Sequence, residues 1–533
     1  MSHLTLKLYR LPVAVLFLLL WVAAPGASAS SGQGRIDWQP FAPAAFAQAR
    51  AEGKLVLLDL VAVWCHWCHV MDAETYADPV VAAYIARHYV PVKADHDARP
   101  DLAERYRDWG WPATVVLNAD GEDVVKRAGY ISRDAMLRML AAVVADPSPE
   151  DDPAVAVPTQ IAEDGRLDAA LAETLRARHV AAYDRVEGGL DSAMKFLDQD
   201  SVLWSLRLAA EGDAAEAPRA RHVLDANQAL IDPAFGGVYQ YSTHGDWVHP
   251  HFEKIMKTQW ANLLIYSRAC TQFDEPSYCA AGRRVAAFLT EFLSDADGAF
   301  YSSQDADLVQ GTKGHDYFAL DREARLAQGL PRIDKSRYAA TNGMAIEGLV
   351  ELYLATNDAA YLERARRAAD WVVANRRLWG GGFRHDRIDA AGPYLADTLW
   401  MGRAFLALYR ATGEEAWLTR SRQAAAFIGG NLRDPRAGVV ASADDGTPLK
   451  PSPQIDQNIQ TALWLAELAE ALAEAPTGSV EAQHAAEPLA LARHVMRYLA
   501  APSVATARFT EAGILEVDAR LRAVESRMAH AGG

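Results

Sequence analysis

Cysteine is scarce in this sequence, with four residues among 533. Two of them belong to Cys65-His66-Trp67-Cys68, and no second C-x-x-C follows that could complete a four-cysteine zinc site. The other two, Cys270 and Cys279, flank the turn between two expected helices. We expect these two to form a structural disulfide, and the alternative is a pair of buried free thiols.

Basic residues are outnumbered, with 53 Lys and Arg against 69 Asp and Glu, so the formal net charge is −16. An acidic balance of this size argues against nucleic acid or an anionic membrane surface as a partner.

Long apolar runs are also missing, except for Leu11 to Ala24, which at fourteen residues is short for a membrane span. Lys7 and Arg10 precede this run, and the small residues Ala27-Ser28-Ala29 follow it. The order is typical of a cleaved secretory signal peptide over residues 1–29, and the alternative is an uncleaved membrane anchor. We therefore expect an exported, periplasmic protein without stable membrane insertion after cleavage, in an oxidising compartment that preserves disulfides.

The length predicts two or three domains. A Pro- and acid-rich stretch from Asp146 to Pro153 marks a boundary. We expect a signal peptide at 1–29, an α/β domain at 35–147, a linker at 148–159, an all-helical domain at 160–500 and a C-terminal extension at 501–533.

The α/β domain centres on a nearly continuous apolar run from Leu55 to Val63, which predicts a strand covered on both faces. Cys65 and Cys68 follow where a helix should begin. Unpaired backbone N–H groups and the helix dipole stabilise a thiolate at that position. Because the thiolate is the attacking species, a C-x-x-C placed there is typical of redox chemistry.

Two further residues support this interpretation. Asp59 lies six positions before Cys65 inside the strand, where burial raises the pKa of a carboxyl and lets it accept a proton from the second thiol. Pro112 precedes the next apolar run and suggests a cis-prolyl turn against the sulfurs. The domain thus resembles the thioredoxin fold. The resemblance implies that Cys65 is the nucleophile, Cys68 the resolving thiol, Asp59 the proton acceptor and Pro112 the substrate-side cis-proline.

Three other interpretations of the cysteine pair stay open. Cys65 to His69 is also C-x-x-C-H, the attachment pattern of haem c. Zinc could be bound by both cysteines with nearby His66, His69 or His96, and the pair could be a structural disulfide. The strand before the pair and the Pro-led strand after it favour thioredoxin, so we expect neither a metal nor another cofactor.

Helical periodicity dominates from residue 160 to about 500, and the expected helices come in pairs. Ala355 to Leu362 and Ala411 to Leu418 are copies of one turn between helices. Paired helices that cannot bury their faces alone form closed or stacked arrays. About six pairs fit, which predicts an (α/α)6 toroid.

Four pieces of the chain resemble the spermatogenesis-associated protein 20 family, whose members join a thioredoxin-like domain to a six-hairpin-glycosidase-like domain. The pieces are Cys65 to Met71, Lys93 to Pro100, Tyr241 to Thr243 with Pro250 to Lys254, and Phe300 to Asp307. Three positions depart from the family pattern. Thr341 replaces the tryptophan of W-N-G, Ala396-Asp397-Thr398 stands for D-D-Y, and Met194 to Leu197 stands for P-K-F-P.

The loops between helix pairs of a toroid surround a central cleft, and several polar residues fall near such loops. We expect substrate binding there by His251, Glu253, Asp305, Asp307, Asn342 and Asp397. Carboxylates facing one another across a cleft could act as acid and base, as in glycosidases. The alternative is that the aspartates cap helices and that Glu253 pairs with Lys254.

These observations predict an exported thioredoxin-like thiol–disulfide oxidoreductase whose helical toroid selects the substrate. Its partner would be a protein disulfide or thiol, with a glycan as a further possibility. The alternative is a carbohydrate-active or carbohydrate-binding (α/α)6 protein with an accessory thioredoxin module. A third interpretation is a recruiting protein in which neither domain catalyses.

Overall fold

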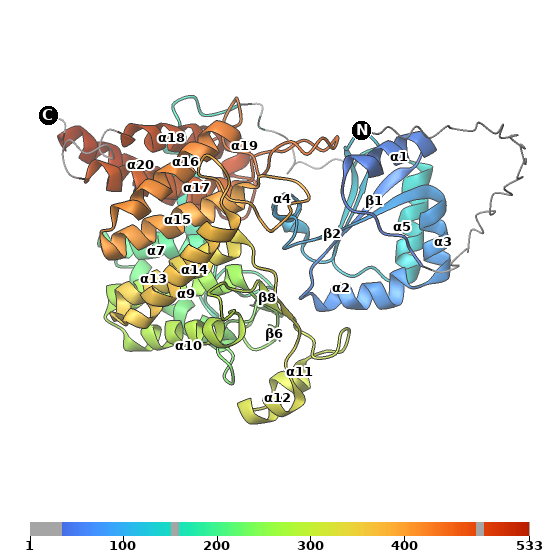
Figure 1. Ribbon diagram of the computed structural model, residues 1–533, viewed down its shortest axis with the longest axis horizontal. Helices are drawn as coiled ribbons and strands as arrows, with labels where there is room; N and C mark the ends of the chain where they lie inside the picture. The colour runs from blue at the N-terminus through green and yellow to red at the C-terminus, as the bar shows by residue number, and fades with distance from the viewer. Residues whose placement is uncertain (1–34, 151–157, 159, 476–483, 532–533) are drawn as a thin grey trace, which may run out of the picture. The chain divides into compact units, whose positions relative to one another are not determined.

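The computed structural model describes residues 35–150, 158, 160–475 and 484–531 (Figure 1). The expected signal peptide at 1–29 lies outside these residues. Residues 34–533 form one unit. Of the helices in the described part of the chain, none has both the length and the apolar character needed to cross a membrane.

The first region is built on a four-stranded sheet in the order β2-β1-β3-β4. β1 is parallel to β2 and antiparallel to β3, and β3 is antiparallel to β4. The strands are β1 (Leu55–Val61), β2 (Tyr89–Asp95), β3 (Ala113–Leu117) and β4 (Asp123–Ala128). The helices are α1 (Pro43–Glu52), α2 (His66–Met71), α3 (Pro79–His88), α4 (Pro100–Arg105) and α5 (Arg133–Ala145). This is the thioredoxin-like α/β fold that the sequence predicts.

Helix α2 begins where the cysteine pair stands. Cys65 is its N-cap, with an extended backbone, and its sulfur accepts a hydrogen bond from the backbone N–H of Cys68 at 3.1 Å. The helix ends after six residues because the chain passes into a π-turn at Asp72–Tyr76. A new helix, α3, starts at Pro79 with Asp78 as its cap.

The second region is a closed ring of helix pairs. Six inner helices each contact the next, and α20 contacts α7 to close the ring. The inner helices are α7 (Gln199–Ala210), α9 (Met256–Phe273), α13 (Ala339–Thr356), α15 (Leu395–Thr412), α17 (Ile455–Ala473) and α20 (Ala512–Ala531). Each packs against an outer partner helix: α8 (Glu216–Asn227), α10 (Pro276–Phe292), α14 (Ala359–Arg376), α16 (Glu415–Asn431), α18 (Ala486–Leu499) and, beside α20, α6 (Ala169–Ala181). The described residues therefore confirm the predicted (α/α)6 class.

The ring extends past residue 500, where the sequence suggested that a C-terminal extension begins. Helix α20 lies between α17 and α7 and pairs with α6 from the start of the region. Ile514, Val517 and Leu521 on α20 are fully buried. The sixth pair joins the two ends of the region, so a search for adjacent hairpins cannot find it.

Close helix approach in the ring depends on small residues. A Cβ added at Gly343 on α13 would lie 2.6 Å from the carbonyl carbon of Trp400 on α15. The two inner helices therefore pack at a distance that only glycine permits at this position.

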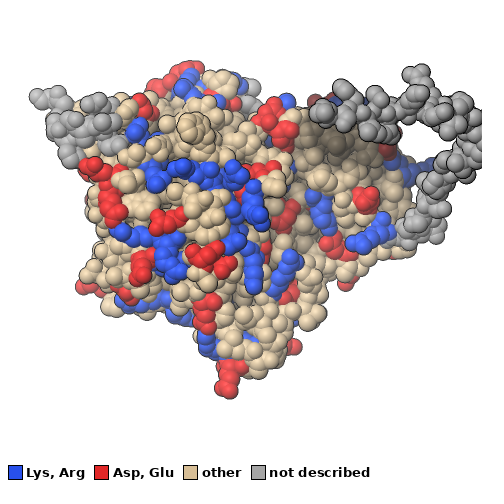
Figure 2. All heavy atoms as spheres, in the orientation of Figure 1, with Lys and Arg blue, Asp and Glu red and all other residues tan. Residues whose placement is uncertain are grey.

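Short elements in the loops between helix pairs carry several of the predicted site residues. They are β5 (Tyr241–Ser242), β6 (Pro250–His251), β7 (Lys254–Ile255), β8 (Ser303–Gln304), β9 (Ile333–Asp334), α11 (His315–Phe318), α12 (Arg322–Gln328) and α19 (Pro502–Ala505). β7, β8 and β9 form a three-stranded sheet, and β5 pairs with β6. Acidic and basic side chains are interspersed over the face shown in Figure 2.

Candidate active site

The cysteine pair of α2 is a disulfide with a Cα–Cα distance of 5.3 Å. Both cysteines are only 3% exposed. The Trp111–Pro112 peptide bond is cis, and Trp111 packs against the cluster that contains both cysteines. Cys65 and Cys68 are thus bonded to each other in this structure.

Asp59 lies fully buried in β1, where it pairs in register with Lys93 of β2 and Thr114 of β3. Burial raises the pKa of Asp59 to about 6, although the positive charge of Lys93 opposes the shift. The ammonium of Lys93 lies 3.1 Å from Asp59 and 2.6 Å from Asp72. A buried carboxyl with a pKa near neutrality is suited to accept and return a proton.

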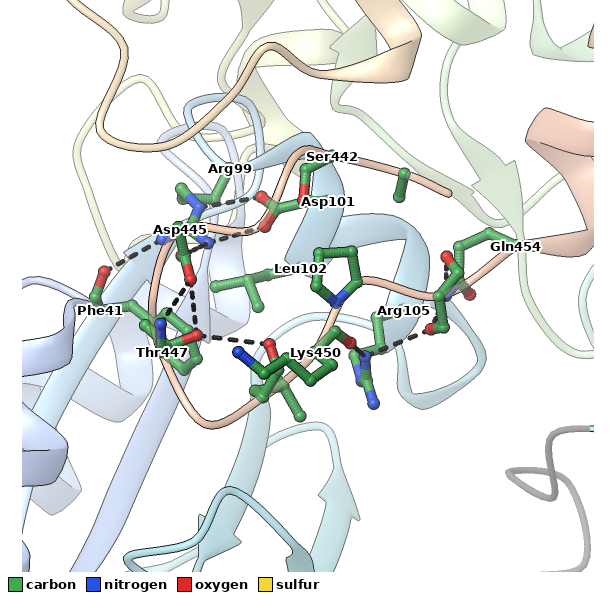
Figure 3. Close-up of a pocket in the computed structure, with 14 residues that line it drawn as sticks. Phe41, Arg99, Asp101, Leu102, Arg105, Ser442, Asp445, Thr447, Lys450 and Gln454 are labelled. Atoms are coloured by element: carbon green, nitrogen blue, oxygen red, sulfur yellow. Dashed lines mark hydrogen bonds and ion pairs between the residues drawn. The ribbon is translucent and has the colours of Figure 1, made fainter. Parts of the chain in front are cut away.

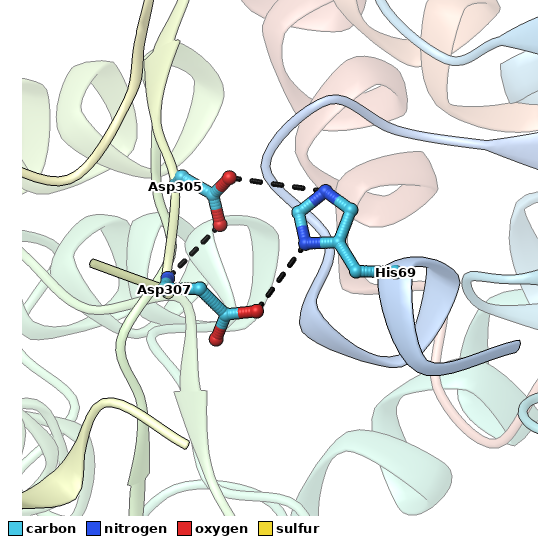
Figure 4. Close-up of side chains that lie close together, drawn as sticks. All are labelled: His69, Asp305 and Asp307. Carbon is cyan, nitrogen blue, oxygen red and sulfur yellow. Dashed lines mark hydrogen bonds and ion pairs between the residues drawn. The ribbon is translucent and has the colours of Figure 1, made fainter. Parts of the chain in front are cut away.

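The two histidines beside the cysteines, His66 and His69, contact aspartates of the helical ring, and Figure 4 shows His69 with Asp305 and Asp307. His66 Nδ1 donates to Asp307 Oδ1 at 2.7 Å. His69 Nδ1 lies 3.3 Å from Asp307 Oδ2, and His69 Nε2 lies 3.2 Å from the carbonyl oxygen of Val63. Both nitrogens of His69 face oxygen acceptors, an arrangement that favours the doubly protonated imidazole.

The pKa shifts in this cluster agree with an ion pair. Burial alone would lower the pKa of His69, but the hydrogen bond to Asp307 and the charges of Asp305 and Asp307 raise it. Burial alone would raise the pKa of Asp307, but hydrogen bonds from His66 and His69 lower it. Burial raises the pKa of Asp305 to about 6.

Three potential metal-ligand atoms also lie within 4.8 Å of one another: a ring nitrogen of His69 and one carboxylate oxygen each of Asp305 and Asp307. These residues could hold a divalent cation. Asp305 Oδ2 is buried and has no hydrogen-bond partner among the described residues. A cation here would have to displace a proton of His69.

His251 ends β6, and Glu253 lies immediately before β7. Glu253 is buried, and burial raises its pKa to about 7. Burial and the charges of His66 and Lys313 lower the pKa of His251 to about 4, so the two side chains, 3.9 Å apart, form no strong ion pair at neutral pH. Lys254 does not pair with Glu253, because its ammonium donates to Asp232 at 2.7 Å.

Asn342 and Asp397 lie elsewhere. The amide of Asn342 bonds the backbone N–H and carbonyl of Phe300 at 2.7 and 3.1 Å. Asp397 accepts from the backbone N–H of Ala340 at 2.9 Å and lies 2.9 Å from His385 Nδ1. These contacts anchor helix ends and loops, and neither residue is among those that line the large cavity described next.

A cavity of about 570 Å³ lies between the cysteine pair and the centre of the ring. Cys65, Trp67, His96 and Trp111 line it from the thioredoxin-like region. The ring contributes side chains from α7, α9, α13, α15, α17 and α20, together with His251 and Glu253. Of the predicted site residues, the cysteine pair, His251 and Glu253 therefore meet at this cavity, together with Trp111, the neighbour of Pro112. Asp305 and Asp307 lie beside α2 instead.

Further contacts fix the two regions to each other. Asp97 accepts from the hydroxyl of Ser302 at 2.9 Å, and its carbonyl oxygen lies 2.6 Å from His385 Nε2. Arg99 binds Asp445 at 3.3 Å, and Arg105 donates to the carbonyl of Lys450 at 2.9 Å (Figure 3).

Sequence reasoning considered His66, His69 and His96 only as zinc ligands, and it missed Asp97, Asp200 and Glu511. The signal that could have found the histidines and Asp97 was already present, because they belong to the two N-terminal pieces that resemble the spermatogenesis-associated protein 20 family. For Asp200 and Glu511 the sequence carries no local signal, since they meet through ring closure.

Comparisons with known proteins show similarity to one family model and to several proteins. A family model described as "Thioredox_DsbH: Protein of unknown function, DUF255" matches residues 29–145. Human spermatogenesis-associated protein 20 is 28% identical over 309 residues, which cover 51% of this chain and 39% of that protein. The chain thus spans about two-fifths of that relative's length.

Two other similarities concern one region each. Thiol:disulfide interchange protein DsbD 2 of Pseudomonas aeruginosa is 36% identical over 80 residues, 14% of each chain. The structure of cellobiose 2-epimerase from Bacillus thermoamylovorans B4167 superposes with a TM-score of 0.46 at 10% identity, covering 60% of this chain and 86% of that one. The chain thus matches the Thioredox_DsbH family model over residues 29–145 and is similar to spermatogenesis-associated protein 20 over 309 residues.

Proposed function

We propose that the protein is a thiol–disulfide oxidoreductase whose helical ring selects the substrate. The observation that carries the proposal is that Cys65 lines the cavity in the ring centre. The N-cap position of Cys65 and the hydrogen bond from the Cys68 N–H stabilise a thiolate there.

In the reducing direction the chemistry balances as follows. The thiolate of Cys65 attacks a substrate disulfide, forms a mixed disulfide and releases one substrate thiolate, which takes up a proton. Cys68 then loses its proton to Asp59 and attacks the Cys65 sulfur, which releases the second substrate thiol and leaves the Cys65–Cys68 disulfide. A dithiol reductant must restore the pair.

Mixing the reduced chain with bis(2-hydroxyethyl) disulfide tests the proposal. In this single-turnover experiment we expect the unaltered chain to release two 2-mercaptoethanol molecules, Cys65→Ser to release none, and Cys68→Ser to hold a trapped mixed disulfide on Cys65, seen as added mass. The double variant Cys270→Ser/Cys279→Ser is the matched control and should keep its turnover. Equal rates in the unaltered chain and Cys65→Ser would refute the proposal.

We propose export to the periplasm on the sequence of residues 1–29. Fusing residues 1–34 to a reporter that is active only outside the cytoplasm should give activity. The same fusion with Leu18→Arg and Leu19→Arg should give none, and activity in that control would show that the apolar run is not an export signal.

A carbohydrate-active or carbohydrate-binding ring is the second candidate. It is favoured by Trp260 and Trp400, which line the same cavity as the buried carboxyl of Glu253. A thermal-shift series with monosaccharides and disaccharides tests it. Stabilisation that survives Cys65→Ser and is lost in Glu253→Gln would support it, and no shift with any sugar would remove it.

A further inference from the structure

We propose that the substrate is a low-molecular-weight disulfide carrying amino or hydroxyl groups, and not a folded protein. The inference rests on the proposed function and names the substrate class of the same site. Three observations carry it: the surface around the disulfide is covered by the ring, the cavity has the size of a small-molecule site, and carboxyl side chains outnumber Lys and Arg among its lining residues.

The ring covers the surface on which a protein substrate would dock. The backbone N–H of Ala306 donates to the carbonyl of Trp64 at 3.4 Å, Asp307 binds the histidines of α2, and Ile255 packs against the cysteine pair. Trp64, Cys65 and Cys68 are only 2–3% exposed. A stable protein–protein contact needs about 800 Å² per partner, and no such area is open around the disulfide in the described structure.

The size of the cavity fits a small ligand. Small-molecule sites typically enclose about 300–1,000 Å³, and the cavity beside Cys65 measures about 570 Å³. A compound of two short arms joined by a disulfide fits this volume. A folded domain does not.

The cavity lining holds polar atoms without partners. These atoms are themselves buried and belong to residues that line the cavity. Because buried polar atoms are nearly always hydrogen-bonded, a polar ligand toward which these side chains turn would satisfy them. Those among the described lining residues include Glu104 Oε2, Gln199 Nε2, Glu253 Oε2, Gln457 Oε1, Gln460 Oε1 and Glu511 Oε1. Most are oxygen acceptors, so the matching ligand brings N–H or O–H donors.

The charges of the lining favour a cationic donor. Six carboxylates line the cavity against three Lys or Arg side chains: Glu104, Asp198, Asp200, Glu253, Asp456 and Glu511 against Arg107, Lys257 and Arg508.

The three cations are already paired. Lys257 lies 3.2 Å from Glu104, and Arg107 and Arg508 both bind Asp456. Asp200 has only the amide of Gln460 at 3.2 Å, and Glu511 lies 3.7 Å from Arg508. Burial raises the pKa of Asp200 to about 6 and that of Glu511 to about 8, which an ammonium group beside them would reverse.

The test compares four disulfides with the reduced full-length chain: cystamine, bis(2-hydroxyethyl) disulfide, 3,3′-dithiodipropionate and insulin. Each rate is divided by the rate of the same disulfide with dithiothreitol, which removes intrinsic reactivity. We expect normalised kcat/KM to be highest for cystamine, lower for the hydroxyethyl compound and at least tenfold lower for the dicarboxylate. Insulin should react no faster than with free thiol.

Variants separate the amine from the hydroxyl contribution. Glu511→Gln and Asp200→Asn should lower kcat/KM for cystamine about tenfold and lower that of the hydroxyethyl compound by a clearly smaller factor, because only the amine loses a charge partner. Glu474→Gln, at an exposed position at the end of α17, is the matched control. If a variant fails to fold, the substrate series on the unaltered chain decides alone.

The outcomes distinguish two kinds of failure. No turnover of any disulfide would overturn the proposed function itself. Turnover of insulin as fast as of cystamine, or of the dicarboxylate as fast as of the amine, would leave the redox function standing and overturn the substrate class.

Discussion

Replacing Asp307 should loosen the contact between the active-site helix and the ring. Asp307 is 1% exposed and receives His66 at 2.7 Å and His69 at 3.3 Å. Removing one partner of a buried ion pair costs roughly 3–5 kcal/mol. In Asp307→Asn the remaining amide oxygen still accepts one hydrogen bond, so we expect the lower end, about 3 kcal/mol, or about 100-fold in the opening equilibrium.

Amide hydrogen exchange measures this opening directly. Protection of the backbone amides in Cys65–Met71 should fall about 100-fold in Asp307→Asn. The matched control is Asp316→Asn, an exposed aspartate nine positions along the chain that has no ion pair among the described residues. Protection in the control should stay within twofold.

The effect should depend on pH in a defined window. The raised pKa of His69 gives stability that is complete below its unfolded value of about 6.5 and is lost as pH rises through the folded value. The lowered pKa of Asp307 gives stability that is present above about pH 4 and is lost as pH falls through the folded value. The variant and the unaltered chain should therefore differ most between about pH 4 and 6.5 and converge at higher pH. Equal protection at pH 6, or a difference that grows toward pH 9, would refute the ion pair.

Three further predictions concern single groups. Asp59→Asn should slow thiol–disulfide exchange. Because ionising a carboxyl with a pKa near 6 costs stability above that pH, the substitution should raise the unfolding free energy by up to about 3 kcal/mol at pH 7.5 but not at pH 4, with the exposed Asp316→Asn as control. Replacing both Cys270 and Cys279 with serine removes their disulfide and should lower the free energy of unfolding, measured by denaturant titration, by about 2–3 kcal/mol. The rate of thiol–disulfide exchange at Cys65 should not change. Glu253→Gln should remove an inflection near pH 7 from the pH profile of kcat/KM, and an unchanged profile would exclude proton exchange between this carboxyl and the substrate.

The sequence predicted what depends on local pattern. The apolar run before Cys65 forms β1, and the cysteine pair begins a helix, because both features follow from a few adjacent residues. Asp59 and Pro112 were predicted from their spacing relative to Cys65 and to the next apolar run, and the structure places Asp59 opposite Thr114, two residues after Pro112. The repeated turns between helices likewise predicted the helical ring.

The sequence could not predict what depends on how the regions meet. Asp305 and Asp307 were expected to face the cleft, but they lie against α2, whose histidines are about 240 positions earlier in the chain. A polar residue near a helix end can either anchor backbone groups or line the cavity. Asn342 and Asp397 anchor backbone groups, whereas Asp200 and Glu511 line the cavity. Which of these two roles a residue has is decided by the closure of the helical ring.

The buried position of the disulfide also limits how it can be restored after each turnover. A reductant must attack one of two cysteines that are 3% exposed, so it either enters the cavity as a small dithiol or meets an opened contact between α2 and the ring. In the first case, the rate of reduction by dithiothreitol divided by the rate of reduction by a thioredoxin-like protein is the same in Asp307→Asn as in the unaltered chain. In the second case the variant accelerates reduction by the protein alone, in proportion to its loss of amide protection. The ion pair of Asp307 with His66 and His69 would then set the rate at which the protein reductant reaches the disulfide.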